Sequence, residues 1–218
     1  MRKERDSMGE VSVPDDSYYG AQTQRAKENF NVSGKPIPFP IIKALGYIKK
    51  SAAIINNQLY KDRITDAIRD SILQASDEII DGKLNSQFVV DVFQTGSGTS
   101  SNMNINEVIA NRANEIMGSE VGSKFPVHPN DHVNFGQSSN DVFPTAISIS
   151  VAMETKENLL PILNELKENL ASLSKKFAGI IKIGRTHLQD ATPISLGQEF
   201  SGYSSMIEKD ISRIMHSL

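Results

Sequence analysis

The chain has 218 residues, of which 39% are hydrophobic and 22% are charged, an ordinary composition for a globular protein that buries a core. Its formal net charge of −3 at pH 7 gives no basic face of the kind that binds nucleic acid. Cysteine is absent, which excludes disulfides and cysteine nucleophiles and suits a reducing cytoplasm. No apolar run approaches the roughly 18 residues of a membrane span, and the first residues have no signal-peptide pattern. We therefore expect a cytoplasmic protein that binds neither nucleic acid nor membrane.

The pattern of apolar residues predicts helices separated by irregular segments. Residues 1–40 look irregular, because the three prolines of SGKPIPFP prevent a helix there. From Ile41 apolar residues recur at helical spacing, and a further helix is predicted over 62–81. A third helix is predicted over 101–117, with Ile105 and Ile109 among its buried residues. The expected buried face of the first helix consists of Ile41, Leu45, Ile48, Ala52 and Ile55. The run QFVVDVF at 87–93 has the composition of a short strand.

The longest predicted helix covers 140–177, with Pro144 in its first turn and Pro161 inside, where a proline should kink it. A last helix is predicted to begin with Thr192 as N-cap and Pro193 at the first helical position. The expected fold class is all-α, with a smaller N-terminal helical domain over 1–137 and the first long helices of a bundle over 138–218. Two long amphipathic helices cannot close a core alone, so we expect self-association or a longer protein.

Three polar clusters stand at the entrances of predicted helices. The first, TGSGTSSNMNINE at 95–107, has glycines that let the backbone approach a ligand. Its hydroxyl and amide groups precede a helix N-terminus, which favours a carboxylate or phosphate. It is not a P-loop, since no Gly-Lys-Ser/Thr follows. A Ser/Thr-rich cap without a ligand is the alternative.

The second cluster, VHPNDHVNFGQSSND at 127–141, contains QSSND at the start of the long helix and HPND just upstream. It offers donors to an anion in the same way as the first. A metal site of His128, Asp131 and His132 is less favoured, because a proline intervenes and no further carboxylate follows. A polar loop that satisfies its own backbone is the other alternative.

The third cluster, KIGRTHLQDATPISLGQEF at 182–200, lies between the two last helices. His187 is a candidate general acid or base, although a lone histidine is more often structural. A Ser/His/Asp hydrolase is not supported, because no Gly-x-Ser-x-Gly elbow is present. Three such entrances in one chain indicate a small dicarboxylate held at both ends, or an acid together with a phosphate.

The segments GSGTSSNMNINEVIANRA, VHPNDHVNFGQSSNDVFPTA and KIGRTHLQDATPISLGQEFSGY occur in this order. On these motifs the chain resembles the N-terminal portion of class II fumarate hydratase, in the fumarase/aspartase superfamily. The resemblance implies a fumarase-type helical bundle and reversible hydration of fumarate to L-malate, with no metal or organic cofactor. It also implies a homotetramer whose active sites are shared between subunits.

The resemblance also implies roles for individual residues. His187 would be catalytic, orienting the active-site water or exchanging a proton with it. The substrate-binding residues would be Ser97, Thr99, Asn102, Ser138, Ser139, Asn140 and Thr186. A secondary dicarboxylate site would consist of His128, Asn130 and Asp131.

Two alternatives remain. One is an aspartate ammonia-lyase-like enzyme, but aspartases tend to carry Gln in place of His187 and Thr in place of Ser139. The other is a non-catalytic dicarboxylate-binding or assembly module. The family's later loop, Gly-Ser-Ser followed by Met-Pro-x-Lys-x-Asn, supplies the serine thought to be the base, and it is absent from these residues. We therefore expect this chain to be inactive alone.

Overall fold

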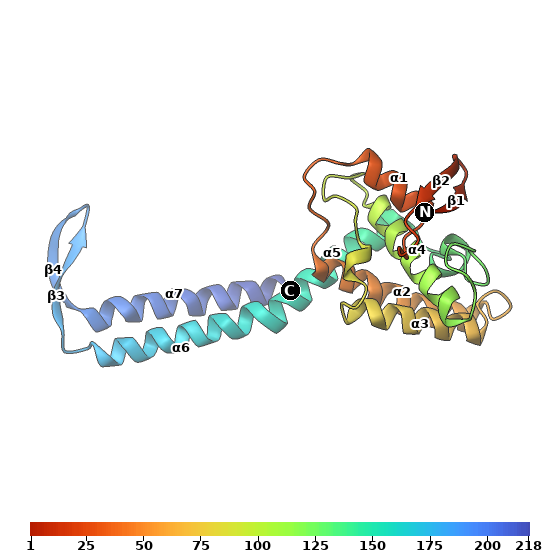
Figure 1. Cartoon of the computed structure of the whole chain (residues 1–218). Helices are drawn as coiled ribbons and strands as arrows, with labels where there is room; N and C mark the ends of the chain where they lie inside the picture. Colours follow the sequence, from red (N-terminus) through yellow and green to blue (C-terminus); the bar gives the residue numbers. More distant parts are fainter. The chain divides into compact units, whose positions relative to one another are not determined.

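A computed structural model describes residues 1–218 and is mainly helical, which confirms the predicted fold class (Figure 1). The chain divides into two compact units, Met1–Ser150 and Val151–Leu218. The expected domain boundary after residue 137 falls just before helix α5 (Ser139–Glu154), whereas the compact units divide inside that helix. The boundary at 137 stays a prediction.

The first unit is built from helices and one small hairpin. The hairpin pairs β1 (Arg2–Asp6) with β2 (Gly9–Val13) in antiparallel register. The helices that precede α5 are α1 (Ala21–Asn29), α2 (Phe39–Leu59), α3 (Asp66–Ile80) and α4 (Thr99–Ile116), with a 3-10 turn η1 (Asn85–Gln87) and a π-helical turn η2 (Pro129–Val133). Residues 1–40 are therefore more ordered than expected. Pro36 and Pro38 lie between α1 and α2, and Pro40 is the second residue of α2, where its missing N–H leaves no intrahelical hydrogen bond unmade.

Helix α4 lies at the centre of the first unit, with α1, α2 and α3 packed around it (Figure 1). Ile105 and Ile109 are fully buried on α4, as the sequence predicts. Against them pack Ile72 and Ile79 of α3, each at most 1% exposed. Burial of such side chains contributes about 1.5–3 kcal/mol each, so this helical core holds the polar segments at the start of α4 and α5 in place.

Two expectations for the first unit are wrong in detail. The buried face of α2 includes Leu45, as predicted, but Ile55 is 50% exposed and Lys49 is fully buried. Residues 87–93 do not form a strand. Asp91 makes only an isolated bridge to Pro36, and its carboxylate accepts backbone N–H groups from the loop at residues 33–34. The Asp91 carboxylate thus satisfies backbone N–H groups of Ser33 and Gly34 that a neighbouring strand would otherwise satisfy.

The second unit is a helical pair with a hairpin between its helices. It contains the π-helical turn η3 (Thr155–Leu159) and helices α6 (Leu160–Lys176) and α7 (Leu196–Ser217). These two helices lie side by side (Figure 1), and strands β3 (Ile181–Thr186) and β4 (Gln189–Ser195) connect them as an antiparallel hairpin. Apolar side chains remain exposed on both helices, including Ile162 (62%) and Met206 (62%).

The last helix begins three residues later than predicted. Thr192 and Pro193 belong to β4, and Ser195 is the N-cap of α7. The Ser195 hydroxyl accepts the N–H of Gln198 at 3.1 Å, and the Gln198 side chain accepts the N–H of Ser195 at 2.8 Å. This capping box satisfies two backbone donors at once, whereas Pro193 is tolerated in a two-stranded hairpin because both strands are edges.

Pro161 affects its helix through a π-helical turn. The turn η3 ends two residues before Pro161, which is the second residue of α6. A proline has no N–H to donate and its ring crowds the carbonyl four residues earlier. A wider π turn at that point relieves the crowding.

No helix of the chain is both long enough and apolar enough to cross a membrane.

Candidate anion-binding site

The first two polar clusters lie against each other in the first unit. Gly98 is the N-cap of α4 and has a left-handed backbone with φ of +67°. The ring of Phe143, on α5, occupies the space that a β-carbon on Gly98 would need. The start of α4 therefore meets the start of α5 through a contact that only glycine permits.

A small pocket opens at this junction. It has a volume of about 260 Å³ and is lined by Gly96, Ser97, Asn140, Phe143, Pro144 and Ile147. The Ser97 hydroxyl lies 2.9 Å from the Thr99 hydroxyl. Two predicted substrate-binding residues from separate clusters, Ser97 and Asn140, thus line one pocket, with Thr99 hydrogen-bonded beside it.

Asn102 and Ser139 form a direct link between the same two helices. The Asn102 amide nitrogen donates to the Ser139 hydroxyl oxygen at 2.9 Å. Asn102 is fully buried, whereas Ser139 is half-buried and Ser138 is exposed. The structure thus shows Asn102 as a support for Ser139, and direct ligand contact by Asn102 stays a prediction.

A buried lysine belongs to this cluster, although the apolar pattern of the sequence does not predict it. The Lys49 ammonium on α2 donates to the side-chain oxygens of Asn134 and Gln137, each at 2.9 Å. Burial lowers the pKa of Lys49 to about 7. The burial of Lys49 could have been predicted from its position, because it lies four residues after Leu45 and four before Ala53, on the buried face of α2.

The residues of the predicted secondary site use their polar groups locally. The His128 ring nitrogen Nδ1 accepts the backbone N–H groups of Asn130 and Asp131 at 3.3 and 3.2 Å. The His132 Nδ1 accepts the backbone N–H of His128 at 2.8 Å, and burial lowers the pKa of His132. Asp131 also lines a pocket of about 520 Å³ with Asp62, Arg63 and His132. The loop thus satisfies part of its own backbone, and a dicarboxylate role stays a prediction.

Nothing in the arrangement favours the metal alternative. The side chains of the chain form no group of three or more His, Cys, Asp and Glu that could hold a metal ion. The Nδ1 atoms of His128 and His132 are already occupied as acceptors of backbone N–H groups.

Thr186 and His187 lie in the second unit, at the turn between β3 and β4. Both are exposed, and Thr186 pairs with Gln189. His187 and Leu188 have φ values of +49° and +63°, the two positive angles of a type I′ turn. Such angles are unfavourable for residues other than glycine, so the turn holds His187 in a strained, solvent-facing position.

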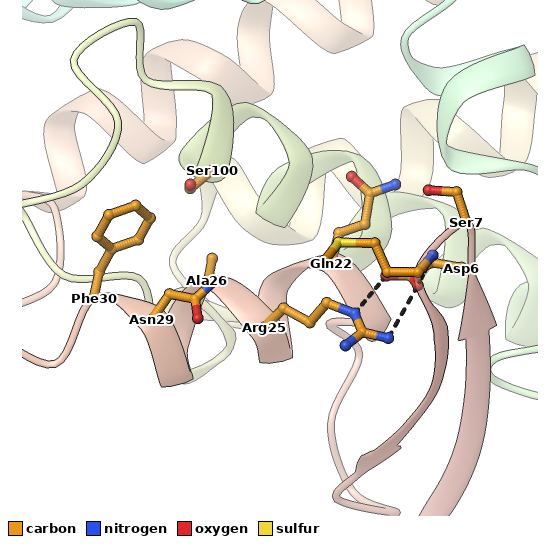
Figure 2. Close-up of a pocket in the computed structure, with 9 residues that line it drawn as sticks. Asp6, Ser7, Gln22, Arg25, Ala26, Asn29, Phe30 and Ser100 are labelled. Atoms are coloured by element: carbon orange, nitrogen blue, oxygen red, sulfur yellow. Dashed lines mark hydrogen bonds and ion pairs between the residues drawn. The ribbon is translucent and has the colours of Figure 1, made fainter.

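A second pocket, of about 270 Å³, lies beside α1 and the first hairpin (Figure 2). Its lining includes Arg25, Asp6 and Ser100. The Arg25 guanidinium donates to Asp6 at 2.8 and 3.1 Å and to the Gly9 carbonyl at 3.1 Å. This arginine is neutralised by an internal carboxylate, so the pocket is less suited to an anion than the α4–α5 junction.

Comparison with known proteins identifies the class to which this arrangement belongs. The model of a protein family described as Lyase matches residues 9–218. The chain therefore belongs to this lyase family. Within it, the sequence corresponds to an N-terminal portion of the class II fumarate hydratases, as the following relatives show.

The chain is 52% identical to the class II fumarate hydratase of Neisseria meningitidis over 217 residues, which cover 100% of the chain and 46% of the relative. It is 54% identical to the mitochondrial fumarate hydratase of Homo sapiens over 216 residues, covering 98% of the chain and 42% of the relative. The chain thus spans less than half the length of these relatives.

Solved structures of related proteins have the same fold as this chain. The native crystal structure of a fumarate lyase:delta crystallin from Brucella melitensis matches with a TM-score of 0.93 and 46% identity, covering 99% of the chain and 48% of that protein. The recombinant class II fumarase of Schistosoma mansoni matches with a TM-score of 0.92 and 47% identity, covering 97% of the chain and 44% of that protein.

Proposed function

We propose that the full-length protein containing this chain catalyses the reversible hydration of fumarate to L-malate. The observation that carries the proposal is the pocket at the α4–α5 junction, which Ser97 and Asn140 line from two separate clusters. Hydroxyl and amide donors at two helix N-termini suit a carboxylate. The similarity to class II fumarate hydratases supports fumarate and malate as the ligands.

The chemistry follows from where negative charge develops. Removal of a proton beside a carboxylate moves charge onto that carboxylate, and preorganised donors stabilise it more in the transition state than in the ground state. Ser97, Thr99 and Ser139 would supply hydroxyl donors, with Asn140 supplying an amide. The resemblance to the family assigns Thr186 to substrate binding and His187 to the active-site water. No cofactor is assigned a role.

We propose further that the 218-residue chain alone does not turn over fumarate or L-malate. Its residues lack the Gly-Ser-Ser and Met-Pro-x-Lys-x-Asn loop that supplies a serine, a lysine and an asparagine in the resembled family. Self-association is part of the proposal, because apolar side chains such as Ile162 and Met206 remain exposed on α6 and α7 and a bundle of this kind closes with three or four helices. A homotetramer in the cytoplasm is the expected form.

The test compares substrates on the full-length protein. Formation of fumarate from L-malate, followed by ultraviolet absorbance, supports the hydratase, and the same assay with L-aspartate tests the ammonia-lyase alternative. Ser97→Ala and Asn140→Ala should each lower kcat/KM roughly 100-fold. Absence of fumarate from both substrates would favour the non-catalytic module. Sustained fumarate formation by the pure 218-residue chain would contradict its proposed inactivity.

A further inference from the structure

Lys49 is a buried basic residue without an acidic partner. It lies on α2, is fully buried, and its ammonium contacts two amide oxygens, those of Asn134 and Gln137. Burial of an ammonium group without a counter-charge is costly unless its hydrogen bonds are satisfied. A buried methionine or leucine would fill the same space without this desolvation cost. The lysine therefore suggests a role that an apolar side chain cannot perform.

The hydrogen bonds from Lys49 have a fixed direction. The Lys49 nitrogen keeps at least two N–H donors whether or not it is protonated, and it donates them to Asn134 and Gln137, so the Asn134 side chain turns its oxygen toward Lys49. The Asn134 amide nitrogen then points the other way and donates to the Gln137 carbonyl at 3.2 Å. The orientation of this amide, which is otherwise ambiguous by 180°, is set by the lysine.

The same oxygen sets the orientation of the next amide. The Asn134 side-chain oxygen also accepts from the Asn102 amide nitrogen at 3.2 Å. Asn102 must therefore turn its nitrogen toward both Asn134 and Ser139, and it donates to the Ser139 hydroxyl oxygen at 2.9 Å. Lys49 thus sets the orientation of the amide groups as far as the hydrogen bond to Ser139, the first residue of α5.

Ser139 is left as a donor at the end of this series. Its oxygen accepts from Asn102, so its single hydroxyl hydrogen is not consumed within the network. If Asn102 were turned over, its oxygen would face Ser139 and compete for that hydrogen. A carboxylate ligand accepts hydrogen bonds only, so the orientation of Asn102 decides whether Ser139 can bind it.

We propose that Lys49 is a positioning residue that acts through Asn134 and Asn102 to keep the Ser139 hydroxyl directed as a donor toward a carboxylate ligand. This inference deepens the proposed function and rests on it for the identity of the ligand. Lys49 itself lies beneath the site, within the core, and the hydrogen-bond series carries its effect.

The first test is a double-mutant cycle on the full-length protein, with kcat and KM measured for L-malate. Lys49→Met and Ser139→Ala should each lower kcat/KM roughly 10- to 100-fold, the range for a lost hydrogen bond to a charged group. In the Ser139→Ala background, Lys49→Met should have almost no further effect, because the two residues act in series. Multiplicative effects would overturn the proposal.

Two further variants separate positioning from folding. Lys49→Gln, which keeps an N–H donor near Asn134, should recover a substantial part of the activity lost in Lys49→Met. Lys50→Met is the matched control, because the adjacent Lys50 side chain bonds to Asp77 on α3 instead, and its kcat/KM should stay near that of the unmodified protein. Equal losses in Lys49→Gln and Lys49→Met would count against an orienting donor.

A third measurement does not depend on activity. In the 218-residue chain, nuclear Overhauser effects should connect the Asn102 side-chain amide hydrogens to the Ser139 β-hydrogens. Lys49→Met should abolish them, and Lys50→Met should preserve them. If the full-length protein acts on neither L-malate nor fumarate, the proposed function fails while this result still decides the inference. Persistence of the effects in Lys49→Met would refute the role of Lys49.

Discussion

The ring of Phe143 covers Gly98 so closely that a β-carbon at residue 98 would overlap it. This contact joins the start of α4 to the first turns of α5, and these two segments carry the candidate anion site. Gly98 also has a positive φ, so the position excludes other residues for two independent reasons.

Replacement of this glycine should therefore be costly. Gly98→Ala is expected to lower the free energy of unfolding by about 2–5 kcal/mol, since left-handed backbone costs about 1–2 kcal/mol and overpacking about 1–3 kcal/mol. Gly96→Ala is the matched control, because a β-carbon there meets nothing within 4 Å. Urea unfolding of both variants checks the prediction, and equal midpoints would contradict it.

His132 should make the first unit sensitive to mild acid. Burial lowers the pKa of His132 in the folded protein, so below about pH 6.5, the ordinary histidine value, the unfolded chain binds the extra proton more readily. Unfolding then takes up protons, and stability should fall as the pH drops from 7 to 5.

The matched variant for this prediction is His132→Asn, whose side-chain oxygen can accept the N–H of His128 without titrating. Its free energy of unfolding, followed by urea titration at several pH values, should decline less steeply over the same range. Parallel curves for the two proteins would show that His132 does not contribute.

An ion pair between α3 and α4 should make stability depend on pH in a more acidic range than His132 does. Arg112 donates to both carboxylate oxygens of Glu78, at 2.6 and 2.8 Å, and holds the pKa of that carboxyl below its usual range. The stabilisation is therefore present above the unfolded pKa, about 4.3, and is lost as the pH falls through the lower folded value. Glu78→Gln should cost about 1–3 kcal/mol at pH 7 and progressively less toward pH 3, as measured by urea unfolding. A cost that does not vary with pH would argue against the ion pair.

The turn between β3 and β4 should gain stability from glycine. Leu188 is 87% exposed and has a φ of +63°, so Leu188→Gly removes backbone strain while losing little packing. We expect the free energy of unfolding of the chain to rise by about 1 kcal/mol. Gln189→Gly, at the neighbouring strand position, should lower it by about 0.5–1 kcal/mol. Thermal unfolding compares them, and a destabilised Leu188→Gly would contradict the strain argument.

Helical periodicity predicted the core elements well and their exact faces less well. The helix predicted over 101–117 is α4, and Ile105 and Ile109 are buried as expected. Lys49 was missed because a pattern of apolar residues passes over a charged side chain, and only packing shows that its ammonium meets amide oxygens. The polar segments were found from their residue types, but their assembly into one pocket depends on the approach of the start of α4 to the first turns of α5.

The start of α7 could have been placed more accurately from the sequence. Ser195 and Gln198 have the spacing of a capping box, a more specific signal than the Thr192–Pro193 pair. The π-helical turn before Pro161 was not predictable in the same way, because a proline predicts distortion without its form. The hairpin of β3 and β4 is short and exposed, so it has little apolar alternation to reveal it.

The π-helical turn η3 also changes which residues of α6 lie on the same face as the residues before the turn. A π turn holds one residue more than an α turn, and one residue corresponds to roughly 100° around a helix. Side chains after Leu159 therefore face a direction displaced by that angle from an uninterrupted helical wheel. A heptad pattern drawn straight from Val151 to Leu173 joins two different faces, so deletion of one residue within 155–159 should bring them into phase and redirect the apolar stripe of α6.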